Sequence, residues 1–182
     1  MKDDAEILVQ LIKPSATVPL EEVYGKFVLT LREPQAPDSV VTVRGVPADT
    51  VAIKVDAFST PDAVFKGEYG ECKRADYVLI SPQNSTIVYI EVKRTRDGFE
   101  DIVNQLKGAQ CFVNYCRDIG KVFWNESDFL LGYKHRFVSI GHTSIAKRKT
   151  RVERTAAIHD NPTKLLKIDW PHHIQFNKLA GA

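Results

Sequence analysis

Three ionisable residues stand in two segments whose composition is otherwise typical of buried strands. Asp76 lies near the start of the apolar run ADYVLI, and Glu91 and Lys93 lie near the end of the run STIVYIEVKRT. Successive side chains of a strand point to opposite faces of the sheet, so Glu91 and Lys93 share a face. The turn-like sequence SPQN joins the two runs, and a hairpin that turns there brings Asp76 level with Glu91. The sequence therefore predicts that two carboxylates and one ammonium meet at one end of a hairpin.

This grouping of charges indicates a divalent metal. Carboxylates that lie close together away from water repel each other and lose hydration, so a cation or a proton must compensate them. Oxygen ligands without His or Cys favour Mg²⁺ or Mn²⁺ over Zn²⁺, and Mg²⁺ completes its shell with water and substrate phosphate. We therefore expect Asp76 and Glu91 to bind Mg²⁺, or Mn²⁺ in its place.

The arrangement of Asp76 and Glu91-Val92-Lys93 resembles the motif of the PD-(D/E)XK nuclease superfamily. The resemblance implies a core of helix, three strands, helix and strand, with acidic residues that hold a divalent metal. It also implies that Lys93 positions or activates the attacking water. Many members place a glutamine on the following helix so that it faces the site, and Gln105 is the matching residue here.

The chain also departs from that family pattern, and it contains a second copy of the short motif. Ala75 stands where a proline is expected before Asp76, and the helix lacks the Gln-x-x-x-Tyr of some exonuclease branches. These departures leave the subfamily open. A second Glu-x-Lys occupies residues 71–73, but it follows a glycine-flanked segment with no apolar strand before it, so the copy at residues 91–93 is preferred. A surface ion pair at a strand end is the alternative interpretation.

Hydrophobic periodicity predicts the elements that position these residues. Helices are expected at 3–12 and 98–118, and strands at 26–33, 39–45, 50–58, 75–80, 85–95 and 136–143, with two short strands around Pro171 within 164–176. Gly120 is the expected stop of the second helix. The order predicts an α/β fold with a mixed central β-sheet flanked by helices, a restriction-endonuclease-like αβββαβ core and extra N-terminal strands.

The length of 182 residues predicts a single domain, with the core at about 50–142 and a basic C-terminal extension at 143–182. No apolar stretch approaches the roughly 18 residues that a membrane span requires. The start of the chain is acidic where a signal peptide carries positive charge, so a cytoplasmic protein without a membrane partner is expected.

Basic residues are concentrated in the second half of the chain. Residues 1–91 hold 9 Lys and Arg against 14 Asp and Glu, a net charge of −5, whereas residues 92–182 hold 16 against 9, a net charge of +7. Such asymmetry is typical of proteins that bind an anionic partner on one face. The run of Lys147, Arg148, Lys149 and Arg151 is predicted to contact phosphates, and a solvated loop is the open alternative.

These features predict a metal-dependent nuclease that hydrolyses phosphodiester bonds, with Asp76, Glu91, Lys93 and Gln105 as its site. The expected partner is nucleic acid, with DNA ahead of RNA. Action as a homodimer or within a larger complex stays open. The alternative function is that of a catalytically inactive nuclease-like module that binds nucleic acid or another protein.

Overall fold

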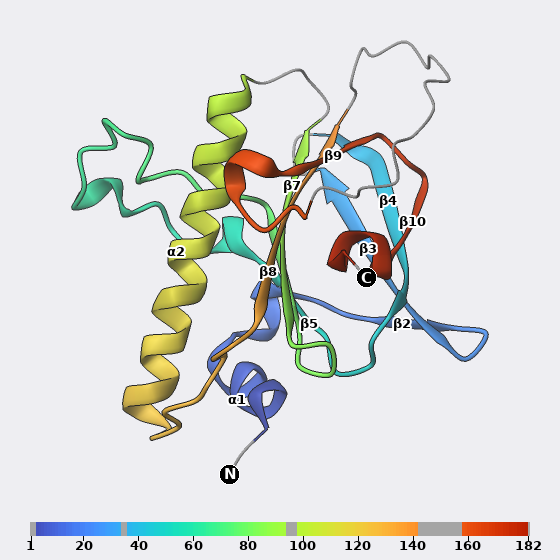
Figure 1. Cartoon of the computed structure of the whole chain (residues 1–182), viewed down its shortest axis with the longest axis horizontal. Coiled ribbons are helices and arrows are strands. Elements are labelled where there is room, and N and C mark those ends of the chain that lie inside the picture. The colour runs from blue at the N-terminus through green and yellow to red at the C-terminus, as the bar shows by residue number, and fades with distance from the viewer. Residues whose placement is uncertain (1–2, 34–35, 94–97, 142–157, 182) are drawn as a thin grey trace.

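The computed structural model describes residues 3–33, 36–93, 98–141 and 158–181 (Figure 1). The helices are α1 (Asp4–Leu11), α2 (Phe99–Phe123) and α3 (Phe176–Ala180), with single 3₁₀ turns at Pro14–Ala16, Val55–Ala57, Pro61–Ala63 and Pro162–Lys164. The strands are β1 (Thr17–Val18), β2 (Glu21–Val23), β3 (Lys26–Glu33), β4 (Ala36–Val46), β5 (Val51–Lys54), β6 (Tyr77–Ser81), β7 (Thr86–Lys93), β8 (Lys134–Gly141), β9 (Leu166–Asp169) and β10 (His173–Gln175). None of the helices in these ranges is both long enough and apolar enough to span a membrane.

A mixed six-stranded sheet forms the centre of the fold, in the order β1-β5-β6-β7-β8-β9. Strands β5, β6 and β7 are antiparallel neighbours, whereas β7, β8 and β9 run parallel. Parallel neighbours need a crossover connection, and α2 provides it between β7 and β8. The expected hairpin and the helix that follows it are therefore confirmed.

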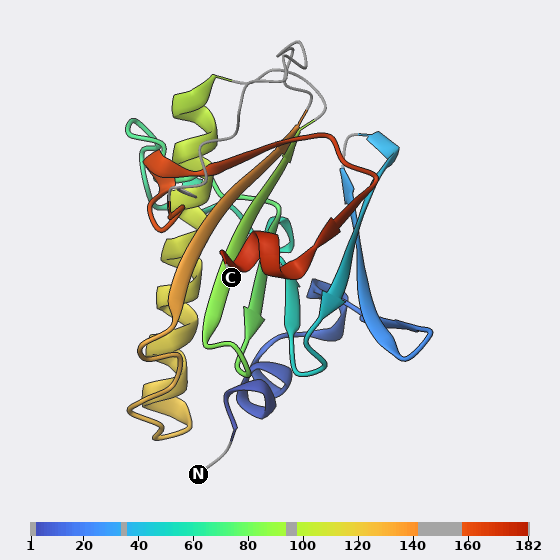
Figure 2. The same ribbon diagram turned by 45° about the vertical axis from the view of Figure 1, so that its right-hand side comes forward.

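The two faces of this sheet are covered differently (Figure 2). One face packs against α2 and α1 in a core that includes Ile7, Leu106 and Tyr89. The other face packs against a second sheet of order β10-β4-β3-β2, and α3 contributes Phe176 to this core. The mixed sheet with helices beside it and the extra N-terminal strands were expected, whereas the packing of β3 and β4 over the second face of the central sheet was not predicted.

Burial on both faces explains the unbroken apolar composition of the central strands. All residues of β6 are buried, and along β7 only Lys93 is half-buried. In β7, Ile87 and Tyr89 face α2, whereas Val88 and Ile90 face the second sheet. By alternation, Glu91 lies on the α2 face.

Helix α2 runs past the stop that the sequence predicted. It continues to Phe123 through Gly120, which is buried. A Cβ atom at Gly120 would overlap the ring of Phe129, so this glycine allows close packing of the helix against the segment that follows it. The two short strands around Pro171 are confirmed as β9 and β10, although they join different sheets, and α3 follows them without having been predicted.

Candidate functional site

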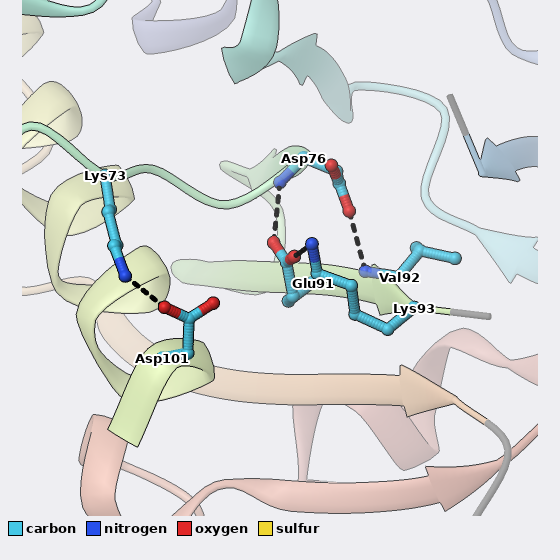
Figure 3. A network of polar contacts seen from close by, with 6 residues as sticks. All are labelled: Lys73, Asp76, Glu91, Val92, Lys93 and Asp101. Carbon is cyan, nitrogen blue, oxygen red and sulfur yellow. Dashed lines mark hydrogen bonds and ion pairs between the residues drawn. The ribbon is translucent and has the colours of Figure 1, made fainter. Parts of the chain in front are cut away.

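The β6–β7 register places Asp76 beside Glu91. Tyr77 pairs with Ile90 in this antiparallel hairpin. The residue before Tyr77, Asp76, therefore lies opposite the residue after Ile90, Glu91. The backbone N–H of Asp76 donates to Glu91 Oε2 at 3.2 Å, and the backbone N–H of Val92 donates to Asp76 Oδ2 at 2.8 Å (Figure 3). These two bonds fix both carboxylates at the strand ends, as the sequence predicted.

Lys93 completes the group on the same face of β7. Its Nζ lies 3.0 Å from Glu91 Oε1, and 19% of its side chain is exposed, whereas the Glu91 side chain is fully buried. Within the described residues, the Lys93 ammonium is the one polar group that contacts Glu91 Oε1, which accepts no other hydrogen bond. A buried carboxylate oxygen of this kind retains lone pairs that can bind a cation.

The surroundings of Glu91 favour its neutral form when no metal is bound. Burial is the main cause, the negative charge of Asp76 acts in the same direction, and together they raise the pKa of Glu91 to about 9. The charge of Lys93 and its contact with the carboxylate oppose this rise without cancelling it. The site therefore needs more positive charge than Lys93 supplies if both carboxylates are to be ionised at neutral pH.

The donor set fits Mg²⁺ or Mn²⁺ better than it fits Zn²⁺. Two carboxylates converge, and one of them has a buried oxygen that contacts only the Lys93 ammonium among the described residues. Within the described ranges no three His, Cys, Asp or Glu side chains form a cluster that could hold a metal. Two carboxylates with no imidazole or thiolate suit a hard cation that keeps several waters and takes the rest of its shell from substrate phosphate.

A neighbouring ion pair holds the segment before Asp76 against the start of α2. Lys73 Nζ pairs with Asp101, which lies in the first turn of the helix (Figure 3). A Cβ atom at Gly108 would overlap the backbone carbonyl oxygen of Lys73, so only glycine permits this approach. Sequence analysis did not identify Asp101 as part of the site region, because its partner is 28 residues away.

The Glu-x-Lys at residues 71–73 has a structural role. Glu71 is exposed in a turn and accepts the backbone N–H groups of Gly67 and Tyr69, each at 2.9 Å. Its own backbone N–H, together with those of Tyr69 and Gly67, lowers the pKa of the Glu71 carboxyl. The preference for the copy at residues 91–93 agrees with this placement, because only that copy lies on a central strand.

Gln105 does not join this group through a hydrogen bond. Gln105 lies on α2, which covers the same face of the sheet, and its buried Oε1 accepts no hydrogen bond. It makes no hydrogen bond to the three central residues, so its role in the site stays a prediction. Lys147, Arg148, Lys149 and Arg151 lie outside the described residues.

Comparisons with known proteins assign this chain to no family. The class of protein must therefore be argued from the fold and from the geometry of the site. No protein-family model matches the chain, and no curated protein or solved structure matches it. Within the described ranges the chain is a mixed α/β protein with two open mixed β-sheets and three helices.

Proposed function

We propose that the protein is a metal-dependent nuclease that hydrolyses phosphodiester bonds of DNA. The observation that carries the proposal is the convergence of Asp76, Glu91 and Lys93 at the ends of two adjacent strands, around a buried carboxylate oxygen whose partner is the Lys93 ammonium. The similarity of this triplet to the PD-(D/E)XK motif supports it. The order α1, β5, β6, β7, α2 and β8, with β1 to β4 inserted between α1 and β5, supports a restriction-endonuclease-like core.

In this mechanism Asp76 and Glu91 would bind the metal, and Lys93 would position the attacking water. A bound Mg²⁺ or Mn²⁺ supplies positive charge that lowers the pKa of water and stabilises charge developing on the phosphate. Burial keeps Glu91 protonated when no metal is bound, and only the ionised carboxylate would bind the ion. Metal binding should therefore release a proton from Glu91. The partly exposed ammonium of Lys93 is placed to donate to the attacking water and to orient it.

The proposal is tested by incubating the purified protein with supercoiled, linear and single-stranded DNA and with RNA, in Mg²⁺, Mn²⁺ or EDTA. Cleavage of DNA should require the metal. Asp76→Asn, Glu91→Gln and Lys93→Met should each lower the cleavage rate by at least about 100-fold while the proteins stay folded. Glu71→Gln is the matched control from the other Glu-x-Lys, and it should cleave as the wild type does.

Calorimetry separates the role of the metal from the rest of the site. Mn²⁺ should bind the wild type and bind much more weakly to Asp76→Asn, because a neutral amide does not balance the charge of the ion. Cleavage at the wild-type rate by all three site variants would refute the assignment. Binding of DNA without any metal-dependent cleavage would instead favour the inactive nuclease-like module.

A further inference from the structure

A groove of about 1090 Å³ lies along the second sheet, on the side that no helix of the described ranges covers (Figure 2). Thr30, Thr42 and Arg44 line it. Their neighbours Leu29, Leu31, Val41 and Val43 belong to the core between the sheets, so by alternation the lining side chains point away from that core. The β6–β7 turn and the first residues of α3 also border the groove. It is thus a surface feature of the molecule that is separate from the carboxylate site.

The side chains that line the groove suit an anionic polymer with hydrogen-bonding edges. Lys26 and Arg44 are exposed cations, and Glu21 is the one acidic residue among the described lining residues. The guanidinium of Arg44 also donates to His173 Nε2 at 3.4 Å, which steadies it above the sheet. Four side-chain amides complete the lining, from Gln83, Asn84, Gln175 and Asn177. Cations bind phosphates, and amides hydrogen-bond to the edges of bases.

Tyr24 adds an aromatic ring at the tip of the β2–β3 hairpin that borders the groove. Val23 pairs with Lys26, so Tyr24 and Gly25 form a two-residue turn, with φ values of 50° and 71°. Two positive φ values are typical of a type I′ turn, where Asn-Gly is the favoured pair. A bulky residue with positive φ is strained, and the ring of Tyr24 is 100% exposed. Tyr24 is thus a strained and fully exposed aromatic residue that is accessible to a ligand.

A β-bulge shapes the floor of the groove beside Arg44. The β3–β4 register shifts between Phe27 and Val28, and Gly45, with φ of 67°, is the additional residue. A Cβ atom at Gly45 would lie 3.4 Å from Gln175 Oε1, so a longer side chain would extend into the groove. Bulges of this kind redirect side chains beside binding sites.

We propose that this groove binds an unpaired stretch of nucleic acid. The ring of Tyr24 stacks on a base, Lys26 and Arg44 contact phosphates, and the amides contact base edges. Stacking on an exposed aromatic side chain requires a base that has left the duplex, which is why the strand is unpaired. This inference rests on the proposed function in one respect only, namely that the polymer bound is the polymer cleaved.

The position of the groove allows binding and cleavage to be measured separately. Gln83 and Asn84 lie at the opposite end of β7 from Glu91, and eight strand residues span about 26 Å. The groove therefore holds a flanking part of the substrate and leaves the scissile phosphate to the carboxylate site.

The stacking contact is tested with a single-stranded oligonucleotide that contains 2-aminopurine, in EDTA so that no cleavage occurs. Tyr24→Asn should weaken binding roughly 5- to 100-fold and abolish the fluorescence change, while Tyr24→Phe keeps both. Tyr69→Asn is the matched control, because Tyr69 is 86% exposed and lies outside the groove. Wild-type affinity in Tyr24→Asn would overturn the inference, as would equal affinity for free dAMP or for the blunt duplex.

The phosphate contacts are tested through the salt dependence of the same binding. The double variant Lys26→Gln/Arg44→Gln should reduce the magnitude of the salt slope by about 1.4 for a single strand, because two contacts are lost. Lys13→Gln removes an exposed cation from another surface and should leave the slope unchanged. An unchanged slope in the double variant, or displacement of the strand by poly-glutamate at equal charge concentration, would contradict a nucleic-acid site.

Failure of this inference and failure of the proposed function give different results. Asp76→Asn should bind the oligonucleotide as the wild type does and should not cleave it. If the wild type cleaves DNA but the Tyr24 and Arg44 variants bind normally, only the groove assignment fails. If no protein cleaves but Tyr24→Asn loses binding while Tyr24→Phe keeps it, the groove assignment holds and the nuclease assignment fails.

Discussion

The two ends of β7 place charge in opposite environments. At the end that carries Glu91, the carboxylate is fully buried beneath α2 and is compensated by neighbours in the same hairpin. Near the other end, Lys26 and Arg44 face an open groove and Tyr24 is fully exposed. Because Glu91 is buried, the stability of the first region should depend on pH and on metal. Because the charges of the second region are exposed, ligand binding there should depend on salt concentration. In the proposed function, the first region carries out the chemistry and the second contacts the substrate.

The cause of this contrast lies in the layers that cover the central sheet. Helix α2 lies over the Glu91 face and removes water from it, which raises the cost of charge there. The outer side chains of β3 and β4 have no covering element within the described ranges, so their charges keep their hydration. The four predictions below test this contrast, beginning with the largest expected effect.

The stability of the metal-free protein should depend on pH through Glu91. Its pKa is about 9 in the folded protein and near 4.5 in the unfolded chain, so the folded state binds more protons between these values. The contribution of Glu91 to the free energy of unfolding should therefore be greatest below about pH 4.5 and be lost as the pH rises to about 9, with a slope of at most about 1.4 kcal/mol per pH unit. Urea unfolding in EDTA across this range measures the slope.

The controls for this pH dependence are two neutralising variants. Glu91→Gln should remove most of the slope, because the amide cannot titrate. Glu71→Gln should keep it, since the pKa of Glu71 is lowered and its carboxyl titrates below the window. Added Mn²⁺ should stabilise the wild type most at high pH. Parallel slopes in the wild type and Glu91→Gln would show that burial does not govern this region.

Gly108→Ala should destabilise the buried region without affecting the groove. The added methyl overlaps the carbonyl oxygen of Lys73 and forces the segment that leads to Asp76 away from α2. Overpacking of this kind costs about 1–3 kcal/mol, and Mn²⁺ affinity should fall with it. Gly98→Ala is the matched control on the same helix, because a Cβ atom at Gly98 meets nothing within 4 Å. Chemical denaturation and calorimetry of both variants decide the outcome, and equal stability would be inconsistent with this packing.

Tyr24→Asn should raise the stability of the protein by roughly 0.5–1 kcal/mol. The substitution relieves a left-handed conformation that is unfavourable for tyrosine and creates the Asn-Gly pair that type I′ turns prefer. A gain in stability together with a loss of oligonucleotide binding would mark the tyrosine as retained for function. Thermal unfolding measures the change, and a loss of stability would indicate that the ring supports the fold.

The pair between Lys73 and Asp101 should contribute the least. The two side chains are 45% and 36% exposed, and exposed ion pairs contribute about 0.2–1 kcal/mol. A double-mutant cycle with Lys73→Gln and Asp101→Asn should give a coupling energy in that range that shrinks at high salt. A coupling energy well above it would mean that the pair is part of the buried region.

The sequence determined the local features of this protein. Its alternation and turn residues predicted the hairpin of β6 and β7, and hence that Asp76 lies opposite Glu91 with Lys93 on the same face. Spacings of three and four predicted α2 up to its last turn. These inferences succeed because strand alternation and hairpin register depend on residues close together in the chain. Local periodicity does not fix where α2 ends, because packing of Gly120 against Phe129 overrides the expected stop.

Only the tertiary structure decided the features that join distant segments. It placed β3 and β4 over the second face of the central sheet, paired Lys73 with Asp101, and brought Gln175 beside Arg44 by adding β10 to the sheet edge. The degree of burial of Glu91 depends on α2, and the pKa of Glu91 depends on that burial. Such features follow from which surfaces pack together, and sequence patterns within single elements do not specify long-range packing.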